Sequence, residues 1–65
     1  MNMTYDVNAY DASGELKESA SFCFVDKRES LDAAMACAER LAKRNARVEV
    51  MNFWVTVWAT DMPIK

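Results

Sequence analysis

Few side chains in this sequence can carry out covalent or acid–base chemistry. The 65 residues contain no histidine, which excludes histidine acids and bases, Ser-His-Asp and Cys-His nucleophiles, and histidine metal ligands. With one glycine, Gly14, the chain can form neither a Walker phosphate loop nor a GxGxxG motif. Asp11 and Glu15 flank an expected turn, where solvated charges are the usual occupants. We therefore predict that the protein is not an enzyme and has no catalytic, metal-binding or cofactor-binding residues.

The two cysteines, Cys23 and Cys37, do not form a CxxC pair. Free thiols are the expected state in a reducing cytosol, and a disulfide between them is the alternative. A reactive thiol needs a nearby cation or helix N-terminus, and nothing in the sequence places one beside either residue. We predict that both cysteines are structural.

Length and composition are typical of one small globular domain spanning residues 1–65. Hydrophobic residues make up 52% of the chain and charged residues 28%, a mixture that excludes disorder. The net charge of −2 argues against a strong general affinity for nucleic acid. No apolar run could span a bilayer, and the first residues lack the order of a signal peptide, so we expect a cytoplasmic protein without membrane contact.

Alternating polar and apolar residues predict a β-hairpin from two strands, at residues 4–10 and 16–25. A two-residue turn at Ser13–Gly14 gives a register that matches apolar with apolar residues on one face and polar with polar on the other. The predicted pairs are Met3–Phe24, Tyr5–Phe22, Val7–Ala20, Asp6–Ser21 and Asn8–Ser19. Glu18 is the exception, because it falls on the apolar face opposite Ala9, near the hairpin tip where water can reach it.

Residues 26–45 are predicted to form a helix. Asp26 is the expected N-cap, with Glu29 at the capping-box spacing, and Asn45 can end the helix in the left-handed conformation. Apolar residues recur at helical spacing and make one stripe, rich in alanine, that can sit close to a sheet. The stripe consists of Leu31, Ala34, Met35, Ala38, Leu41 and Ala42.

Residues 47–60 are predicted to form the last strand, which is apolar on both faces. Its phase changes between Val50 and Phe53. A bulge at Met51–Asn52 in one long bent strand explains the change, and so does a tight hairpin there that makes two short strands; we favour the bent strand. The expected fold is a small α+β domain of ββαβ order, an antiparallel sheet with one helix packed on one face.

The two tryptophans of the last strand are the main candidates for a contact surface. If Val55 and Val57 face the helix, both tryptophans face away from it, and one helix covers only one face of the sheet. In the reversed phase the tryptophans form the core, and in a third arrangement residues 62–64 fold back over the apolar surface. We predict a partner-binding surface on the face away from the helix. It consists of Tyr10, Trp54, Thr56 and Trp58.

Four basic residues gather at the C-terminal end of the predicted helix: Arg40, Lys43, Arg44 and Arg47. Cations there complement the negative end of the helix dipole, which is the favoured explanation. The alternative function is a small nucleic-acid-binding protein. In that case the four basic residues contact phosphates, and Tyr10 and the two tryptophans stack on bases. The sequence pI near 4.9 weighs against nucleic acid as the partner.

Three stretches of the sequence define the order and spacing of the predicted elements. They are Tyr5-x-Val7-x-x-Tyr10-Asp11-x-x-Gly14-Glu15, Ser30-Leu31-Asp32-Ala33-Ala34 and Ala38-x-x-Leu41-Ala42-Lys43. This layout resembles the short ββαβ proteins of phages and prophages over most of the chain. The resemblance implies a protein that binds and inhibits a host protein, such as a component of a defence system. We therefore predict a non-enzymatic protein-binding module, inhibitor or regulator, with an unidentified protein partner. We also expect a homodimer, formed through the sheet face opposite the helix or along the edge of the last strand.

Overall fold

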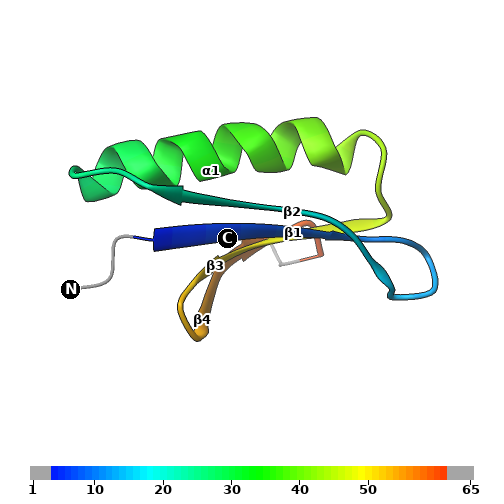
Figure 1. Cartoon of the computed structure of the whole chain (residues 1–65). Helices are drawn as coiled ribbons and strands as arrows, with labels where there is room; N and C mark the ends of the chain where they lie inside the picture. Colours follow the sequence, from blue (N-terminus) through cyan, green and yellow to red (C-terminus); the bar gives the residue numbers. More distant parts are fainter. Residues whose placement is uncertain (1–3, 62–65) are drawn as a thin grey trace.

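The computed structural model describes residues 4–61, which form one four-stranded antiparallel sheet with a single helix packed on one face (Figure 1). Along the chain the elements are β1 (Thr4–Tyr10), β2 (Leu16–Cys23), α1 (Lys27–Ala42), β3 (Arg47–Asn52) and β4 (Val55–Ala59). The strand order in the sheet is β2-β1-β3-β4. This confirms the small α+β fold. The two expectations that involve Met3 and residues 62–64 lie outside the described residues.

The register of the β1–β2 hairpin is the predicted one over most of its length. The observed pairs include Tyr5–Phe22, Asp6–Ser21, Val7–Ala20, Asn8–Ser19 and Ala9–Glu18. Tyr5, Val7 and Ala9 are buried and face the helix, as alternation along a half-buried strand requires.

The turn of this hairpin is wider than the predicted two-residue turn at Ser13–Gly14. The register shifts between Ala9 and Tyr10, and the amide of Gly14 donates to the carbonyl of Asp11 over 3.0 Å. Gly14 has a φ of 89°, which a glycine adopts without strain. The Asp11 carboxylate organises the turn, because its Oδ1 accepts from the Ser13 amide at 2.9 Å and from the Glu15 amide at 3.0 Å.

The core lies between α1 and the first three strands of the sheet. Its largest fully buried apolar side chains are valines, so the layer between helix and sheet is thin. The buried cluster consists of Tyr5, Val7, Ala9, Ala34, Cys37, Ala38, Leu41, Val48 and Val50. Leu31, Met35 and Ala42 pack against it while partly buried, which confirms the predicted stripe. Ser30 is also fully buried, and its Oγ accepts from the Phe24 amide over 2.8 Å.

Both ends of α1 are capped by side chains. Asp26 is the N-cap as predicted, and its carboxylate accepts from the Arg28 amide over 2.7 Å. The helix ends at Ala42, earlier than predicted, and Asn45 does not adopt the left-handed conformation. Instead the Asn45 side-chain amide donates to the Leu41 carbonyl over 2.9 Å, which satisfies one of the exposed carbonyls at the helix end.

Of the two arrangements predicted for residues 47–60, the favoured long bent strand is wrong and the hairpin of two short strands is confirmed, because the chain reverses and forms β3 and β4. The two strands pair antiparallel, and Asn52 opposite Val55 closes the hairpin. The turn residues are therefore Phe53 and Trp54, beyond the Met51–Asn52 position proposed for a bulge or a turn. The register between the strands also shifts at Val50 and Met51.

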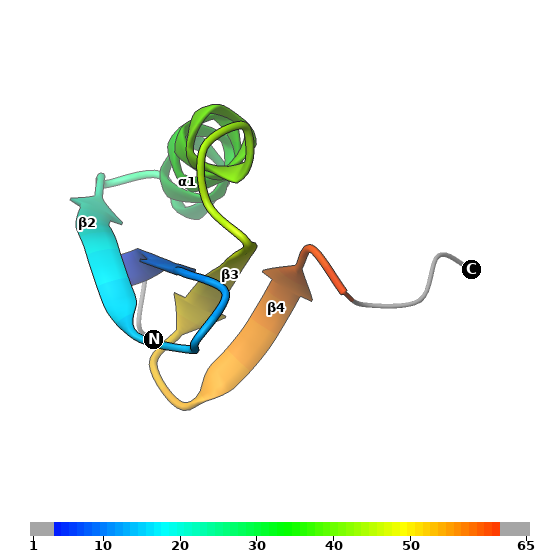
Figure 2. The ribbon, with the colours of Figure 1, turned by 90° about the vertical axis from the view of Figure 1, so that its right-hand side faces the viewer.

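Strand β4 extends the sheet beyond the helix. Among the described residues, α1 packs against β1, β2 and β3 but not against β4 (Figure 2). β4 is also an edge strand, since it pairs only with β3. Among residues 4–61, one margin of the sheet therefore has neither a covering helix nor a further neighbouring strand.

Candidate functional site

The four residues predicted to form one partner-binding surface do not lie together. Trp58 is paired with Val50, a core residue, so it lies on the helix side of the sheet, where it is half-buried against the core. Thr56 is paired with Met51 on the open face, and its hydroxyl donates to the Met51 sulfur over 2.9 Å. Trp54 is in the turn. The prediction that both tryptophans face away from the helix is wrong, because the turn and the register shift change the phase of the second strand.

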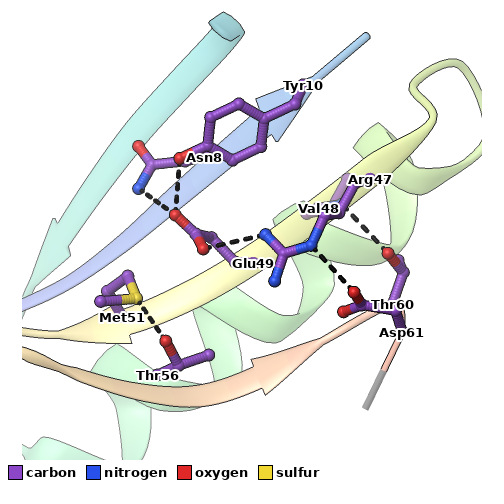
Figure 3. A network of polar contacts seen from close by, with 9 residues as sticks. All are labelled: Asn8, Tyr10, Arg47, Val48, Glu49, Met51, Thr56, Thr60 and Asp61. Atoms are coloured by element: carbon purple, nitrogen blue, oxygen red, sulfur yellow. Dashed lines mark hydrogen bonds and ion pairs between the residues drawn. The ribbon is translucent and has the colours of Figure 1, made fainter. Parts of the chain in front are cut away.

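Tyr10 lies on the open face as predicted, but within a polar network (Figure 3). Its hydroxyl donates to Glu49 Oε2 over 2.6 Å, and the Asn8 amide donates to the same oxygen over 3.3 Å. Arg47 Nη1 donates to Glu49 Oε1 over 3.0 Å, while Arg47 Nε donates to Asp61 over 3.2 Å. The middle of the open face is therefore polar, and Tyr10 has no aromatic partner there.

The ionisation of this network suits a structural role. Burial opposes the charge of Glu49, but hydrogen bonds from Tyr10, Arg47 and Asn8 outweigh it and hold its pKa below the usual value. The hydrogen bond to Glu49 raises the pKa of Tyr10, followed by burial and the nearby negative charge. Glu49 is thus ionised and Tyr10 neutral at physiological pH. The Tyr10 phenol has a raised pKa, and the Glu49 carboxylate is already hydrogen-bonded to three side chains. Neither group is well suited to act as a nucleophile or base.

The predicted basic cluster is partly neutralised within the chain. Arg44 forms an ion pair with Glu18, and Arg47 forms ion pairs with Glu49 and Asp61. Arg40 and Lys43 are exposed and form no ion pair among residues 4–61. The helix end therefore does not present four available cations.

Glu18, the apparent exception in the strand pattern, connects the β1–β2 hairpin to the end of the helix. Arg44 donates to both carboxylate oxygens of Glu18, from Nε over 2.9 Å and from Nη2 over 2.5 Å. The Asn45 side-chain amide adds a third hydrogen bond over 2.8 Å. Hydrogen bonds from Arg44 and then Asn45 lower the pKa of Glu18 to about 2. Its partners come from a segment distant in sequence, so strand periodicity could not reveal them.

This contact predicts a pH-dependent contribution to stability. The pKa of Glu18 falls from 4.5 to about 2 on folding, so its contribution is fully present above pH 4.5 and is lost as the pH falls toward 2. Replacing Glu18 with glutamine is expected to lower the melting temperature at neutral pH, with the difference from the parent shrinking as the pH falls and disappearing below pH 2. The measurement is thermal unfolding followed by circular dichroism across this pH range. Glu39→Gln, on the exposed surface of α1, is the control; an equal effect there would contradict the assignment.

The two cysteines lie in different surroundings. Cys23 is exposed and Cys37 is buried in the core, and both are free thiols. Within residues 4–61 no three residues of the metal-ligating types lie close enough to hold an ion. In the same part of the chain, no helix has the length and apolarity needed to cross a membrane.

The clearest surface feature is a group of large apolar side chains at one end of the sheet. β2 and β3 run in the same direction, so the loop after β2 and the turn after β3 both follow the same ends of their strands, although Figure 1 draws them apart, the loop beside the start of α1 and the turn below the sheet. These two segments expose Phe24 by 46%, Val25 by 94%, Phe53 by 62% and Trp54 by 85%. We call these four residues the apolar end. Three other large apolar side chains are exposed in the described part of the chain: Leu16, Val55 and Val57.

Phe53 occupies an unusual backbone conformation at the apolar end. Its φ is 60°, in a region where a bulky side chain is disfavoured and where hairpin turns commonly place glycine. Its ring contacts that of Trp54 edge to face, with centroids 4.9 Å apart. Strained residues of this kind concentrate at functional sites. The alternative hairpin predicted from the sequence placed the turn at Met51–Asn52, two residues too early, because neither Phe53 nor Trp54 is a usual turn former.

The opposite end of the sheet is charged. Ion pairs there link Lys17 to Asp11 and Glu15, Arg44 to Glu18, and Arg47 to Asp61. A shallow pocket of about 380 Å³ also opens at this end, lined by Tyr10, Asp11, Ala12, Gly14, Ala46 and Arg47. The charged groups of its lining are already bonded within the chain. Of the two ends, the apolar one is the better candidate for an intermolecular contact.

Comparison of the chain with protein-family models, with curated proteins and with solved structures found no match. Its function must then be inferred from the exposure, contacts and charge of its own residues.

Proposed function

We propose that the protein is a non-enzymatic protein-binding module that contacts its partner through the apolar end. The observation that supports this proposal is the exposure of four large apolar side chains on two segments at one end of the sheet. Phe53 and Trp54 also contact each other, and an exposed apolar patch of this kind is typical of interaction surfaces. Tryptophan is among the residues that most often dominate binding energy, and a single one can contribute about 2 kcal/mol or more.

A protein fits this surface better than a nucleic acid or a lipid membrane. The chain carries a net charge of −2, and the charges beside the apolar end are mixed, with Asp26 and Glu29 next to Lys27 and Arg28. Phosphate-rich partners require an excess of cations. The resemblance of the layout to phage and prophage proteins makes a host protein, such as a component of a defence system, the partner that we expect.

Two substitutions at the apolar end test this proposal with little risk to the fold. Phe53→Gly removes an aromatic ring at a position where glycine relieves the positive φ. Trp54→Ser removes a side chain that is 85% exposed. Leu16→Ser is the matched control, because Leu16 is 51% exposed but lies at the charged end.

The measurement is quantitative mass spectrometry of proteins captured from a bacterial lysate by the parent and each variant, with circular dichroism of the same samples. We expect recovery of a specific protein to fall about 30-fold with either apolar-end substitution, the equivalent of 2 kcal/mol, and to stay unchanged with Leu16→Ser. If no captured protein depends on Phe53 and Trp54, or if Leu16→Ser has the same effect, the apolar end is not the contact surface.

A further inference from the structure

The last residues of β4 are anchored to β3. Ala59 is only 2% exposed. The Thr60 amide, just beyond the strand, donates to the Val48 carbonyl over 2.9 Å, and the Val48 amide donates to the Thr60 hydroxyl over 3.2 Å. The ion pair of Arg47 with Asp61, at 3.2 Å, joins the two segments at the same end. We call this end of the β3–β4 hairpin its base.

The first half of β4, next to the turn, is held less firmly. Val55 is 61% exposed, Val57 is 38% exposed, and Thr56 between them is exposed as well. The Thr56 hydroxyl donates to the sulfur of Met51, which is a weak acceptor. Among residues 4–61, α1 packs against the other three strands but not against β4. Little apolar burial therefore holds this half of the strand on the sheet.

A bulge separates the two halves of β4. The register pairs Thr56 with Met51 and Trp58 with Val50, so it skips Val57. An extra residue of this kind interrupts the ladder of hydrogen bonds and lets the strand bend. Val57 thus lies at a hinge position, between the exposed half of the strand and the anchored base.

The turn that closes the hairpin is strained. Phe53 has a φ of 60°, at the first of the two turn residues, where glycine is the usual choice. A side chain with a Cβ atom is disfavoured in this conformation. The strain persists only while the strands stay paired up to the turn, so it favours opening of the hairpin from this end.

We propose that residues 53–57 form a hinged tip, which opens away from β3 about Val57 while residues 58–60 stay in place. Opening releases the positive φ of Phe53. It moves the rings of Phe53 and Trp54, which are in contact, together with the tip. The hinge gives this aromatic pair more than one position relative to the sheet.

Backbone relaxation dispersion, measured by NMR on the free protein, tests the hinge. Local opening takes microseconds to milliseconds, so we expect exchange between two states at residues 53–57 and not in β1. Phe53→Gly is expected to lower the population of the open state about fivefold, because glycine adopts the closed turn without strain. Trp54→Gly is the matched control: it removes the neighbouring ring at a position without a positive φ, and we expect no such fall.

Flat dispersion curves at residues 53–57 would overturn the proposal. Exchange with the same rate and population in every strand would also overturn it, because that would indicate unfolding of the whole domain. The same holds if Phe53→Gly leaves the open population unchanged, or if Trp54→Gly lowers it as much. The inference does not depend on the proposed function: a rigid tip would leave the proposed contact surface standing, and a hinged tip that captures no partner would refute only the proposed function.

Discussion

Replacing Leu41 with alanine is expected to lower the free energy of unfolding by about 3 kcal/mol or more. Leu41 is only 6% exposed and belongs to the core cluster. The other buried helix residues, among them Ala34 and Ala38, are too small to fill the space left by a leucine side chain. A domain of this size has a stability of about 3–5 kcal/mol. A large fraction of the Leu41→Ala molecules should therefore be unfolded without denaturant.

The measurement is urea unfolding followed by circular dichroism, at one protein concentration for all variants. Leu16→Ala is the control, since it removes the same atoms from a leucine that is 51% exposed. We expect the control to change stability by about 0.5 kcal/mol or less. If Leu41→Ala unfolds at the same urea concentration as the parent, α1 does not bury the face that carries Leu41.

The two tryptophans are expected to differ sharply when each is replaced by alanine. Trp58 packs against the core and lies opposite Val50, so its loss should cost about 3 kcal/mol. Trp54 is 85% exposed in the turn, so its loss should cost about 0.5 kcal/mol or less. This differs from what the expectation drawn from strand alternation alone would give, because in that arrangement both tryptophans face away from the helix.

Each single-tryptophan variant also provides its own optical test. In Trp54→Ala the remaining Trp58 is half-buried, and its fluorescence should shift to longer wavelength on unfolding in urea. In Trp58→Ala the remaining Trp54 is already in contact with water, so its emission should change little on unfolding. Equal stability of the two variants would show that Trp58 does not contribute to the core.

Local patterns predicted much of this fold correctly. Alternation from Tyr5 to Ala9 placed β1, and matching it against the residues around Ala20 produced the observed register. A helical stripe ending at Leu41 identified the face of α1 that is buried. Both predictions succeeded because a strand or helix that buries one face repeats its apolar residues with the period of that element.

The second half of the chain was harder to predict for a physical reason. β4 is apolar at four of its five positions, so the period alone did not show which of its residues face the core. The chain reverses at Phe53, whose positive φ is typical of glycine, and no local preference indicates a turn there. The partners of Glu18 were equally hidden, because Arg44 and Asn45 lie on a segment that only folding brings beside it.

The candidate contact surface, like the fold, was predicted in part from the sequence and was in part visible only in the structure. Sequence by itself determined that the chain has no histidine-based site, that its helix has one buried stripe, and that its C-terminal half contains more apolar side chains than one helix can cover. Only the tertiary structure decided which of these side chains remain exposed: the β3–β4 turn placed Trp54 at the apolar end beside Phe53, and pairing with Val50 drew Trp58 onto the core. Exposure depends on strand order and on the reach of α1, and these are set by contacts between segments that lie far apart along the chain.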